Sequence, residues 1–342
     1  MASAFLPRLV NGPWGDPTLY LRLRFERRAL LFDLGDLTRL PPADLLKVSA
    51  AFVSHTHIDH FIGFDHLLRI ILGRHRALAL YGPAGFLDNL EGRLRAYTWN
   101  LVEGLPLVLT AVEVRPQGLT TATFPCSEGF RRVPGPAAQH SEDGCLVRDP
   151  ALTVQATVLD HRIPCLAFAC AEPIHLNVDT VALDRLGLVP GPWITLLKRL
   201  IREGAPVETE IPLPAGAGRK VPRRLGPLRA ALLREAPGER LVYVTDVAYT
   251  PANAGKVIAL ARGADLFYCE AAYLDRDRDL AAERYHLTAA QAGALARQAA
   301  VKRLVLFHFS ARYEREAKPL WHEAREAFGG PVTVPGMWAE GK

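Results

Sequence analysis

With 342 residues, the chain is long enough for one large domain or for two domains of ordinary size. Its composition excludes a disordered protein, because 49% of the residues are apolar and only 23% are charged. The formal net charge of +5 favours a polyanionic partner only weakly, since many basic proteins bind nothing acidic.

The cysteine pattern and the apolar runs indicate the compartment. The five cysteines form no C-x-x-C pair, and their odd number argues against a closed disulfide framework. Residues 1–10 (M-A-S-A-F-L-P-R-L-V) lack the basic region and the long apolar stretch of a signal peptide. Arginines and prolines interrupt every apolar run before it reaches about eighteen residues, the length that a membrane helix needs. We therefore expect a soluble, cytoplasmic protein that does not enter a membrane.

Predicted strands cluster in the first half of the chain. Four segments are typical of strands: 19–25, 29–33, 48–54 and 152–159. In the last of them apolar residues alternate, as they do in a half-buried strand. After 48–54, the stretch 61–72 (F-I-G-F-D-H-L-L-R-I-I-L) has apolar residues at helical spacing, and Gly73 is its expected end.

Residues 171–238 differ from the rest of the chain in composition. They are rich in proline, glycine and arginine, and one stretch in them, 193–202 (W-I-T-L-L-K-R-L-I-R), has a helical pattern. We interpret them as an insertion or arm within a single domain spanning residues 1–342, not as a linker between two domains.

Strands and helices alternate late in the chain. Strands are predicted at 240–245, 265–269 and 303–307. Thr250, Pro251 and Gly263 mark the N-cap, the first position and the end of one helix. Thr288 and Gln291 have the T-x-x-Q spacing of a capping box, so a second helix is expected to begin there. The clustering of strands early and their alternation with helices late predict an α/β layered fold.

Histidine and aspartate side chains follow the ends of four predicted strands, most densely in V-S-H-T-H-I-D-H (53–60). The seven candidate metal ligands are His55, His57, Asp59, His60, His161, Asp246 and His308. Strand ends in open α/β sheets collect at one edge, so these side chains are expected on one rim of a sheet. Imidazole and carboxylate donors suit zinc, manganese or iron. Seven donors exceed the needs of one tetrahedral ion but suit two ions, with one carboxylate between them.

Single histidines carry little weight by themselves. A lone histidine such as His75, His140 or His322 is more often a surface or core residue than a metal ligand. The H-x-H-x-D-H pattern at a strand end is different, because chance rarely assembles it. The three candidates that lie later in the chain gain their weight from this motif.

Five motifs together resemble those of the metallo-β-lactamase superfamily. They are F-D-L-G (32–35), S-H-T-H-I-D-H (54–60), D-H-R (160–162), V-T-D (244–246) and F-H-F-S-A-R-Y (307–313). The segments C-E-A-A-Y-L (269–274) and H-L-T-A-A-Q-A (286–292) precede the last motif in an order similar to that of the ribonuclease Z family, the tRNA 3′-processing endonucleases. The resemblance covers most of the chain and implies the four-layer αββα sandwich of that superfamily.

The resemblance also implies the ligand sets and the cofactor. One divalent ion is expected on His55, His57 and His161, a second on Asp59, His60 and His308, with Asp246 bridging the two. The aspartate of F-D-L-G is expected to support the site. Zinc is the expected metal, although the same ligands accept manganese or iron. A homodimer is a further implication.

Two residues are expected to be catalytic. Asp59 would orient a metal-bound hydroxide that attacks phosphorus, and His286 would protonate the leaving oxygen or contact the scissile phosphate. The position of His286 supports this, because it lies just before a capped helix N-terminus that favours an anion. The alternative is a loop histidine that helps the cap.

Substrate recognition is where the sequence departs from the family. T-D-V-A-Y (245–249) stands where the family commonly has D-T-R after its fourth motif, and Leu287 stands where a small or acidic residue is common. The run G-R-K-V-P-R-R-L-G-P-L-R (218–229) has the clustered cations that bind a phosphate backbone. A solvated arm without a partner is the alternative, and the run has no aromatic residues for base stacking.

Three hypotheses follow. The first is a dinuclear metal phosphodiesterase that cleaves the 3′ trailer of precursor tRNA. The second is a hydrolase of a small ester, lactone, thioester, sulfate ester or cyclic nucleotide on the same metals. The third is a non-catalytic member that keeps a metal for structure, which the complete ligand set and His286 disfavour.

Overall fold

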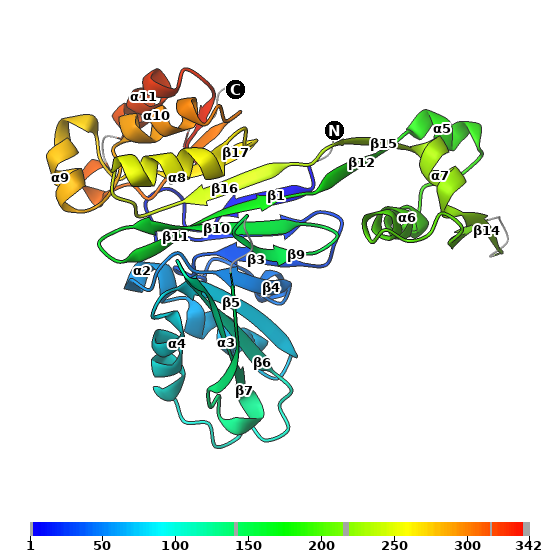
Figure 1. Ribbon diagram of the computed structural model, residues 1–342, viewed down its shortest axis with the longest axis horizontal. Helices are drawn as coiled ribbons and strands as arrows, with labels where there is room; N and C mark the ends of the chain where they lie inside the picture. The colour runs from blue at the N-terminus through cyan, green and yellow to red at the C-terminus, as the bar shows by residue number, and fades with distance from the viewer. Residues whose placement is uncertain (1–2, 140–142, 215–218, 315–316, 338–342) are drawn as a thin grey trace. The chain divides into compact units, whose positions relative to one another are not determined.

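The computed structural model describes residues 3–139, 143–214, 219–314 and 317–337. The chain divides into two compact units, whose elements are labelled in Figure 1. The insert unit comprises Met1–Ala4, Val147–Val154 and Cys170–Glu239; the sheet unit comprises Phe5–Leu146, Gln155–Ala169 and Arg240–Lys342. Each unit has a hydrophobic cluster of its own.

An eight-stranded sheet forms the first half of the sheet unit. Its strands lie in sequence order: β1 (Phe5–Leu9), β2 (Leu19–Leu23), β3 (Ala29–Phe32), β4 (Val48–Phe52), β5 (Ala77–Pro83), β6 (Val108–Arg115), β7 (Gly118–Pro125) and β8 (Val133–Ala138). The four strands from β3 to β6 are parallel, and the others pair antiparallel. The helices of this half are α1 (Pro42–Leu45), α2 (Ile58–Phe61), α3 (Phe64–Ile71) and α4 (Phe86–Arg95). The predictions of strands at 19–25, 29–33 and 48–54 are confirmed.

A seven-stranded sheet forms the second half. Its order is β19 (Val332–Thr333), β18 (Leu304–Phe307), β17 (Leu266–Glu270), β16 (Arg240–Val244), β11 (Pro164–Ala171), β10 (Thr153–Asp160) and β9 (Cys145–Arg148). The helices are α8 (Pro251–Ala261), α9 (Arg278–Glu283), α10 (Ala289–Gln298) and α11 (Ala317–Phe328). Thr250 caps α8, and Thr288 and Gln291 form the capping box of α10, as predicted. The strands β16 to β19 are parallel, as alternating strands and helices require.

Aromatic side chains join the two sheets face to face. Phe168 on β11 packs against Phe32 and Phe52 of the first sheet, with ring centres 5.8 and 5.6 Å apart. Tyr243 on β16 lies 5.9 Å from the Phe32 ring. The outer face of each sheet is covered by helices, α3 and α4 on the first and α8, α10 and α11 on the second. The result is the predicted four-layer αββα sandwich.

The predicted helix over 61–72 is interrupted at Gly63. A Cβ at this position would lie 2.0 Å from the carbonyl oxygen of Gly35, so only glycine fits there. The Gly63 amide also donates to the Leu34 carbonyl, 2.7 Å away. Helical spacing alone could not reveal this close approach, which fixes the F-D-L-G loop against the H-x-H-x-D-H motif.

Within its described residues, the insert unit contains two small sheets and three helices. Strand β12 (Ile174–Val178) pairs with β15 (Leu233–Pro237), and β13 (Glu210–Pro214) pairs with β14 (Lys220–Arg224). The helices are α5 (Thr180–Arg185), α6 (Pro192–Arg202), which was predicted, and α7 (Leu225–Leu232). A buried carboxylate, Glu172, pairs with Arg202 of α6 and with His175 of β12. This ion-pair network fixes α6 to the β12 strand.

Candidate metal centre

All seven predicted ligands lie just after the ends of four strands. The segment 55–60 follows β4, His161 follows β10, Asp246 follows β16, and His308 follows β18. The sequence predicted one rim of one sheet, but β4 belongs to the first sheet and the other three strands to the second. A backbone hydrogen bond of 2.8 Å from Leu166 to Ser54 joins the sheets at this edge. The ligands therefore lie at an edge that the two sheets share.

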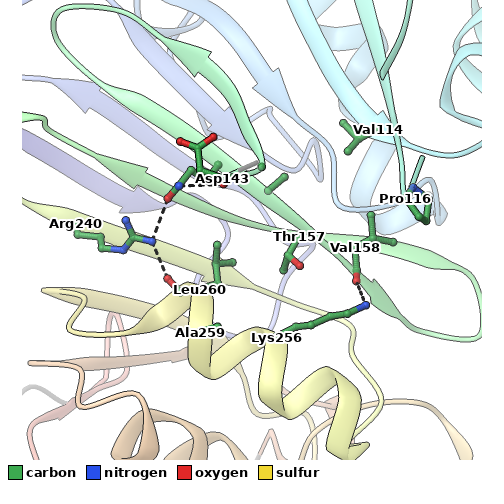
Figure 2. A pocket seen from close by; sticks show the side chains of 12 residues that line it. Val114, Pro116, Asp143, Thr157, Val158, Arg240, Lys256, Ala259 and Leu260 are labelled. Atoms are coloured by element: carbon green, nitrogen blue, oxygen red, sulfur yellow. Dashed lines mark hydrogen bonds between the residues drawn. The ribbon is translucent and has the colours of Figure 1, made fainter. Parts of the chain in front are cut away.

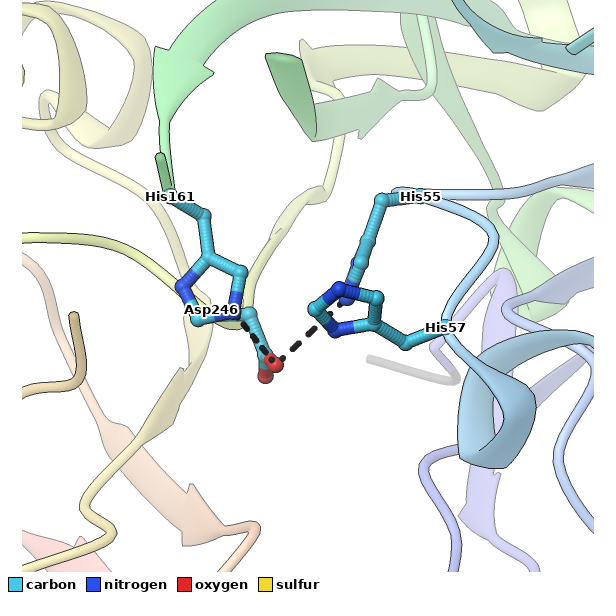
Figure 3. A group of neighbouring side chains, drawn as sticks. All are labelled: His55, His57, His161 and Asp246. Atoms are coloured by element: carbon cyan, nitrogen blue, oxygen red, sulfur yellow. Dashed lines mark ion pairs between the residues drawn. The ribbon is translucent and has the colours of Figure 1, made fainter. Parts of the chain in front are cut away.

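One group of donors consists of His55, His57, His161 and Asp246 (Figure 3), whose ligand atoms lie within 4.8 Å of one another. Asp246 Oδ2 is 3.6 Å from His55 Nε2 and 3.4 Å from His161 Nε2. Three imidazoles around one carboxylate are a common donor set for a transition metal.

A second group consists of Asp59, His60 and His308. Asp59 Oδ2 lies 3.4 Å from His60 Nε2 and 3.6 Å from His308 Nε2. Asp246 reaches this group as well, because its Oδ2 is 3.4 Å from His60 Nε2 and its Oδ1 is 2.9 Å from His308 Nδ1. Asp246 thus lies between the two groups.

The burial of the imidazole nitrogens tests whether these residues fit metal ions. His55 Nε2, His60 Nε2 and His308 Nδ1 are buried among the described residues without any hydrogen-bond partner. A buried nitrogen without a partner is costly, and three that converge on carboxylates are what divalent ions would satisfy. The donors are also of the right chemical types, so the site fits divalent metal ions.

The protonation states of His55 and Asp59 agree with this fit. Burial lowers the pKa of His55 to about 2, which keeps this ring neutral, as a metal ligand must be. Burial acts to raise the pKa of Asp59, but the neighbouring imidazoles of His308 and His60 outweigh it, and the pKa is lowered. Asp59 is therefore an anion at neutral pH.

Asp33, the aspartate of F-D-L-G, orients candidate ligands through hydrogen bonds. Its buried carboxylate accepts hydrogen bonds from His60 Nδ1 (2.9 Å), the Tyr243 hydroxyl (2.8 Å), and the amide and hydroxyl of Ser54 (2.6 and 2.9 Å). Because Nδ1 of His60 donates to Asp33, its Nε2 lone pair is left for the metal position. His161 is held in the same way, by Nδ1 donating to the Tyr285 carbonyl at 2.8 Å.

The backbone is strained at this site. Asp33, Asp246 and His308 are not glycines, yet they have φ angles of 59°, 45° and 57°. Each lies within two residues of the end of a strand. Left-handed conformations of this kind cost roughly 1–3 kcal/mol each and cluster at functional sites. At these three residues, the left-handed conformation turns the chain sharply after the strand and directs the carboxylate or imidazole toward the metal centre.

His286 lies beside the metal centre and has a partner that the sequence analysis missed. Its Nδ1 is 2.7 Å from Oε2 of Glu270. Glu270 is fully buried, and its Oε1 accepts a hydrogen bond from the Val247 amide at 2.8 Å. Burial acts to lower the pKa of His286, but the Glu270 carboxylate outweighs it and raises the pKa. Glu270 ends strand β17, so the strand-end rule that identified histidine and aspartate would have found it if extended to glutamate.

An open hollow of about 450 Å³ exposes this chemistry to solvent. His57, Asp59 and His286 line it together with two cations, Arg284 and Arg312. A cavity of this size, lined by convergent polar groups, is the usual setting of an active site. We call it the catalytic hollow.

A larger hollow of about 580 Å³ lies elsewhere in the sheet unit (Figure 2). Its two cations are engaged by the protein itself. Lys256 donates to the Val158 carbonyl at 2.8 Å, and Arg240 donates to Gln155 and to the Leu260 carbonyl. Five of the seven candidate ligands line the catalytic hollow instead: His57, Asp59, His161, Asp246 and His308.

Other features of the described residues bear on location. In the part of the chain that the structure covers, no helix has the length and apolar character needed to cross a membrane. All five cysteines are free.

Comparisons with known proteins agree with the fold. The model of the beta-lactamase superfamily domain matches residues 30–158 and 204–309. Among solved structures, the metallo-β-lactamase fold protein YhfI from Bacillus subtilis has a TM-score of 0.54 at 17% identity, covering 95% of this chain and 93% of its own. The short form of human tRNase Z has a TM-score of 0.53 at 21% identity, covering 88% and 92%. Fold and site therefore define a protein of the metallo-β-lactamase superfamily.

Curated relatives identify the family within this superfamily. Ribonuclease Z of Deinococcus radiodurans is 38% identical over 301 residues, which cover 87% of this chain and 86% of that protein. Ribonuclease Z of Myxococcus xanthus is 30% identical over 331 residues, covering 93% and 91%. The chain belongs to the ribonuclease Z family.

Proposed function

We propose that the protein is a metal-dependent endoribonuclease that removes the 3′ trailer of precursor tRNA. The observation that carries this proposal is the pair of His/Asp groups that share Asp246, in a chain 38% identical to a ribonuclease Z over most of its length. The first of the three hypotheses thus becomes the conclusion.

The cofactor in this proposal is a pair of divalent ions. One ion would be held by His55, His57 and His161. The other ion would be held by Asp59, His60 and His308, and Asp246 would contact both ions. We propose zinc, which these nitrogen and oxygen donors accept, as they accept manganese or iron. Bound divalent ions neutralise charge on the phosphoryl oxygens and lower the pKa of a water nucleophile.

Two residues of the chain handle water and protons. The ionised Asp59 is 39% exposed and faces the catalytic hollow, so its carboxylate can accept a hydrogen bond from the attacking water and aim it at phosphorus. His286 supplies the proton for the leaving 3′-oxygen. Glu270 holds Nδ1 of that ring, which leaves Nε2 to donate, and the raised pKa of His286 favours the protonated ring.

Cations would hold the substrate. Arg284 and Arg312 line the catalytic hollow and suit the charged oxygens of a scissile phosphate. In the insert unit, Arg219, Lys220, Arg223 and Arg224 are all exposed, and we propose that they bind the tRNA backbone. We propose residues 205–230 as the arm that contacts RNA; of these, residues 215–218 lie outside the described residues.

Organisation and location are further parts of the proposal. We propose that residues 171–238 act as an insertion within one hydrolase domain. Five free cysteines support a cytoplasmic location, where thiols stay reduced.

Ile58 and Ile62 lie one helical turn apart, 72% and 42% exposed, and offer an apolar surface for a homodimer. Light scattering of the purified protein would give the oligomeric state.

The test compares substrate classes on one preparation. We expect a tRNA transcript with a 3′ trailer to be cut once, at the trailer junction, with kcat/KM far above that for a lactone, a thioester or a cyclic nucleotide. A higher kcat/KM for one of the small esters, without cleavage of the transcript, would favour the second hypothesis and contradict the proposal.

A further inference from the structure

A second hollow adjoins the catalytic hollow and shares His286 with it. This hollow has a volume of about 750 Å³, within the range of ligand sites. Its lining includes Tyr249, Tyr285, Ala282, Ala290 and Asp279 in addition to His286. We call it the tyrosine hollow. It belongs to the sheet unit, and no step of the mechanism above uses it.

The aromatic lining suits a flat ligand. Tyr249 is 41% exposed, although a large ring on a surface tends to be covered. The neighbouring Ala282 and Ala290 are small, which leaves room beside the rings. Aromatic side chains that face such a space are the usual stacking partners of unpaired nucleobases. The basic run at 218–229 has no aromatic residue, whereas two tyrosines line this hollow.

The conformation of Tyr285 is a second observation. Its φ angle is 60°, a left-handed conformation that strains any residue other than glycine. The conformation serves the metal centre, since it points the Tyr285 carbonyl at His161 Nδ1. A glycine at position 285 would present the same carbonyl without strain. The backbone conformation therefore does not explain why a tyrosine side chain is present at this position.

The charges of the tyrosine hollow favour a base over a phosphate. Its one arginine, Arg278, is paired with Asp275 at 2.7 Å, and Asp279 adds another negative charge. Carboxylates repel phosphate but accept hydrogen bonds from the amino groups of bases. A cation lies beside one of the two tyrosines: the guanidinium carbon of Arg162 is 6.0 Å from the centre of the Tyr285 ring.

The direction of the reaction decides which nucleotide would bind there. Water oxygen bonds to phosphorus, the bond from phosphorus to the 3′-oxygen breaks, and the proton of His286 goes to that oxygen. The products are a 3′-hydroxyl on the tRNA and a 5′-phosphate on the trailer. The nucleotide that carries the 3′-oxygen must therefore lie next to His286, on the side away from the phosphorus. The tyrosine hollow borders His286 and contains none of the seven proposed metal ligands.

We propose that the tyrosine hollow binds the base of the nucleotide on the 5′ side of the scissile bond, stacked on Tyr249 and Tyr285. This inference rests on the proposed function, because it uses RNA as the substrate and His286 as the proton donor. It explains how unpaired RNA is aligned for cleavage at a site whose metal ions would act on the scissile phosphate and not on the bases.

The binding test uses 2-aminopurine, a fluorescent base that stacking quenches, at that nucleotide in a trailer-bearing tRNA. We expect wild-type protein to quench it, and Tyr249→Ala and Tyr285→Gly to lose most of the quenching. The glycine variant keeps the left-handed backbone, and Tyr249→Phe and Tyr285→Phe are matched controls that retain a ring. Equal quenching by the wild type and by the variants without rings would overturn the proposal.

A cleavage test separates stacking from a structural role. Loss of one base stack should lower kcat/KM for the normal transcript about 10- to 100-fold. An abasic nucleotide at the same position should slow the wild type by a similar factor, and Tyr249→Ala should then have little further effect. Equal losses on both transcripts would show a structural role and overturn the proposal. Failure of every protein to cut the transcript would contradict the proposed function, while the fluorescence result would still decide on the tyrosine hollow.

Discussion

The metal centre and the basic strand β14 use charge in opposite ways. At the metal centre, His55, His60 and Asp33 are fully buried; Nδ1 of His55 lies 3.0 Å from the Ser54 hydroxyl, and Nδ1 of His60 donates to Asp33 at 2.9 Å. On β14, Arg224 pairs with Glu208 at 2.9 Å, but both side chains are about two-thirds exposed, so the pair adds little to stability. Charges at the centre are coupled to one another, whereas those on β14 remain available to a partner.

The comparison predicts that changes at the centre affect every substrate, whereas changes on β14 affect only binding of a long polyanion. Four variants test it, in order of decreasing effect.

Asp246→Asn should have the largest effect. Asp246 lies between both donor groups, so loss of its charge weakens both metal positions. We expect kcat/KM on the tRNA transcript to fall on the order of 10⁴-fold or more, equal to several kcal/mol of barrier. Asp88→Asn, at a surface carboxylate 79% exposed, is the matched control and should retain activity. A variant at Asp246 with near-normal turnover and metal content would exclude a bridging role.

His286→Ala should rank second. Loss of a general acid typically lowers turnover about 10²- to 10⁴-fold, and the ion content should stay normal, because His286 is assigned to protons. Metal analysis of the variant decides between the roles. Depleted metal would identify His286 as a ligand, a role suggested by its grouping with Asp246, Glu270 and His308.

Charge reversal on β14 should have a smaller and more selective effect. The double variant Lys220→Glu and Arg223→Glu should raise KM for tRNA and reduce the salt dependence of binding by about one unit of slope for each phosphate that the variant no longer neutralises. Hydrolysis of bis(p-nitrophenyl) phosphate should change far less. The control is Arg262→Glu with Arg297→Glu, which changes the net charge equally at exposed positions near the C-terminal ends of α8 and α10. Equal losses with both double variants would point to net charge alone.

Tyr243→Phe should have the smallest effect on activity. The change removes a buried hydroxyl that donates to Asp33 at 2.8 Å, while the ring stays in the core. A hydrogen bond to a charged group contributes about 1.5–3 kcal/mol, so urea denaturation should show a loss of that size. Tyr81→Phe, in a ring stacked on Phe52, is the control. An unchanged unfolding free energy would show that Asp33 does not depend on Tyr243.

The candidate metal ligands that the structure brings together could be predicted because their pattern is local in the sequence. The H-x-H-x-D-H motif places four donors within six residues, and His161, Asp246 and His308 each follow a strand that could be recognised from its composition. The capped starts of α8 and α10 were equally readable, because capping involves neighbours in the chain.

The rest of the site depends on interactions between residues far apart in the chain. Glu270 is 16 residues from His286, and Tyr243 is 210 residues from Asp33, so no local pattern connects either pair. The meeting of two sheets at one edge, the positive φ of Asp246 and the close approach of Gly63 to Gly35 also arise from packing. Spacing along the chain does not record such interactions.

The most direct test of the central claim is the number of metal ions that the protein binds. Native mass spectrometry of the wild-type protein, loaded with zinc and freed of excess metal, should show two ions per chain, and Asp246→Asn should show fewer. One ion per wild-type chain at saturation would contradict two metal positions that share Asp246.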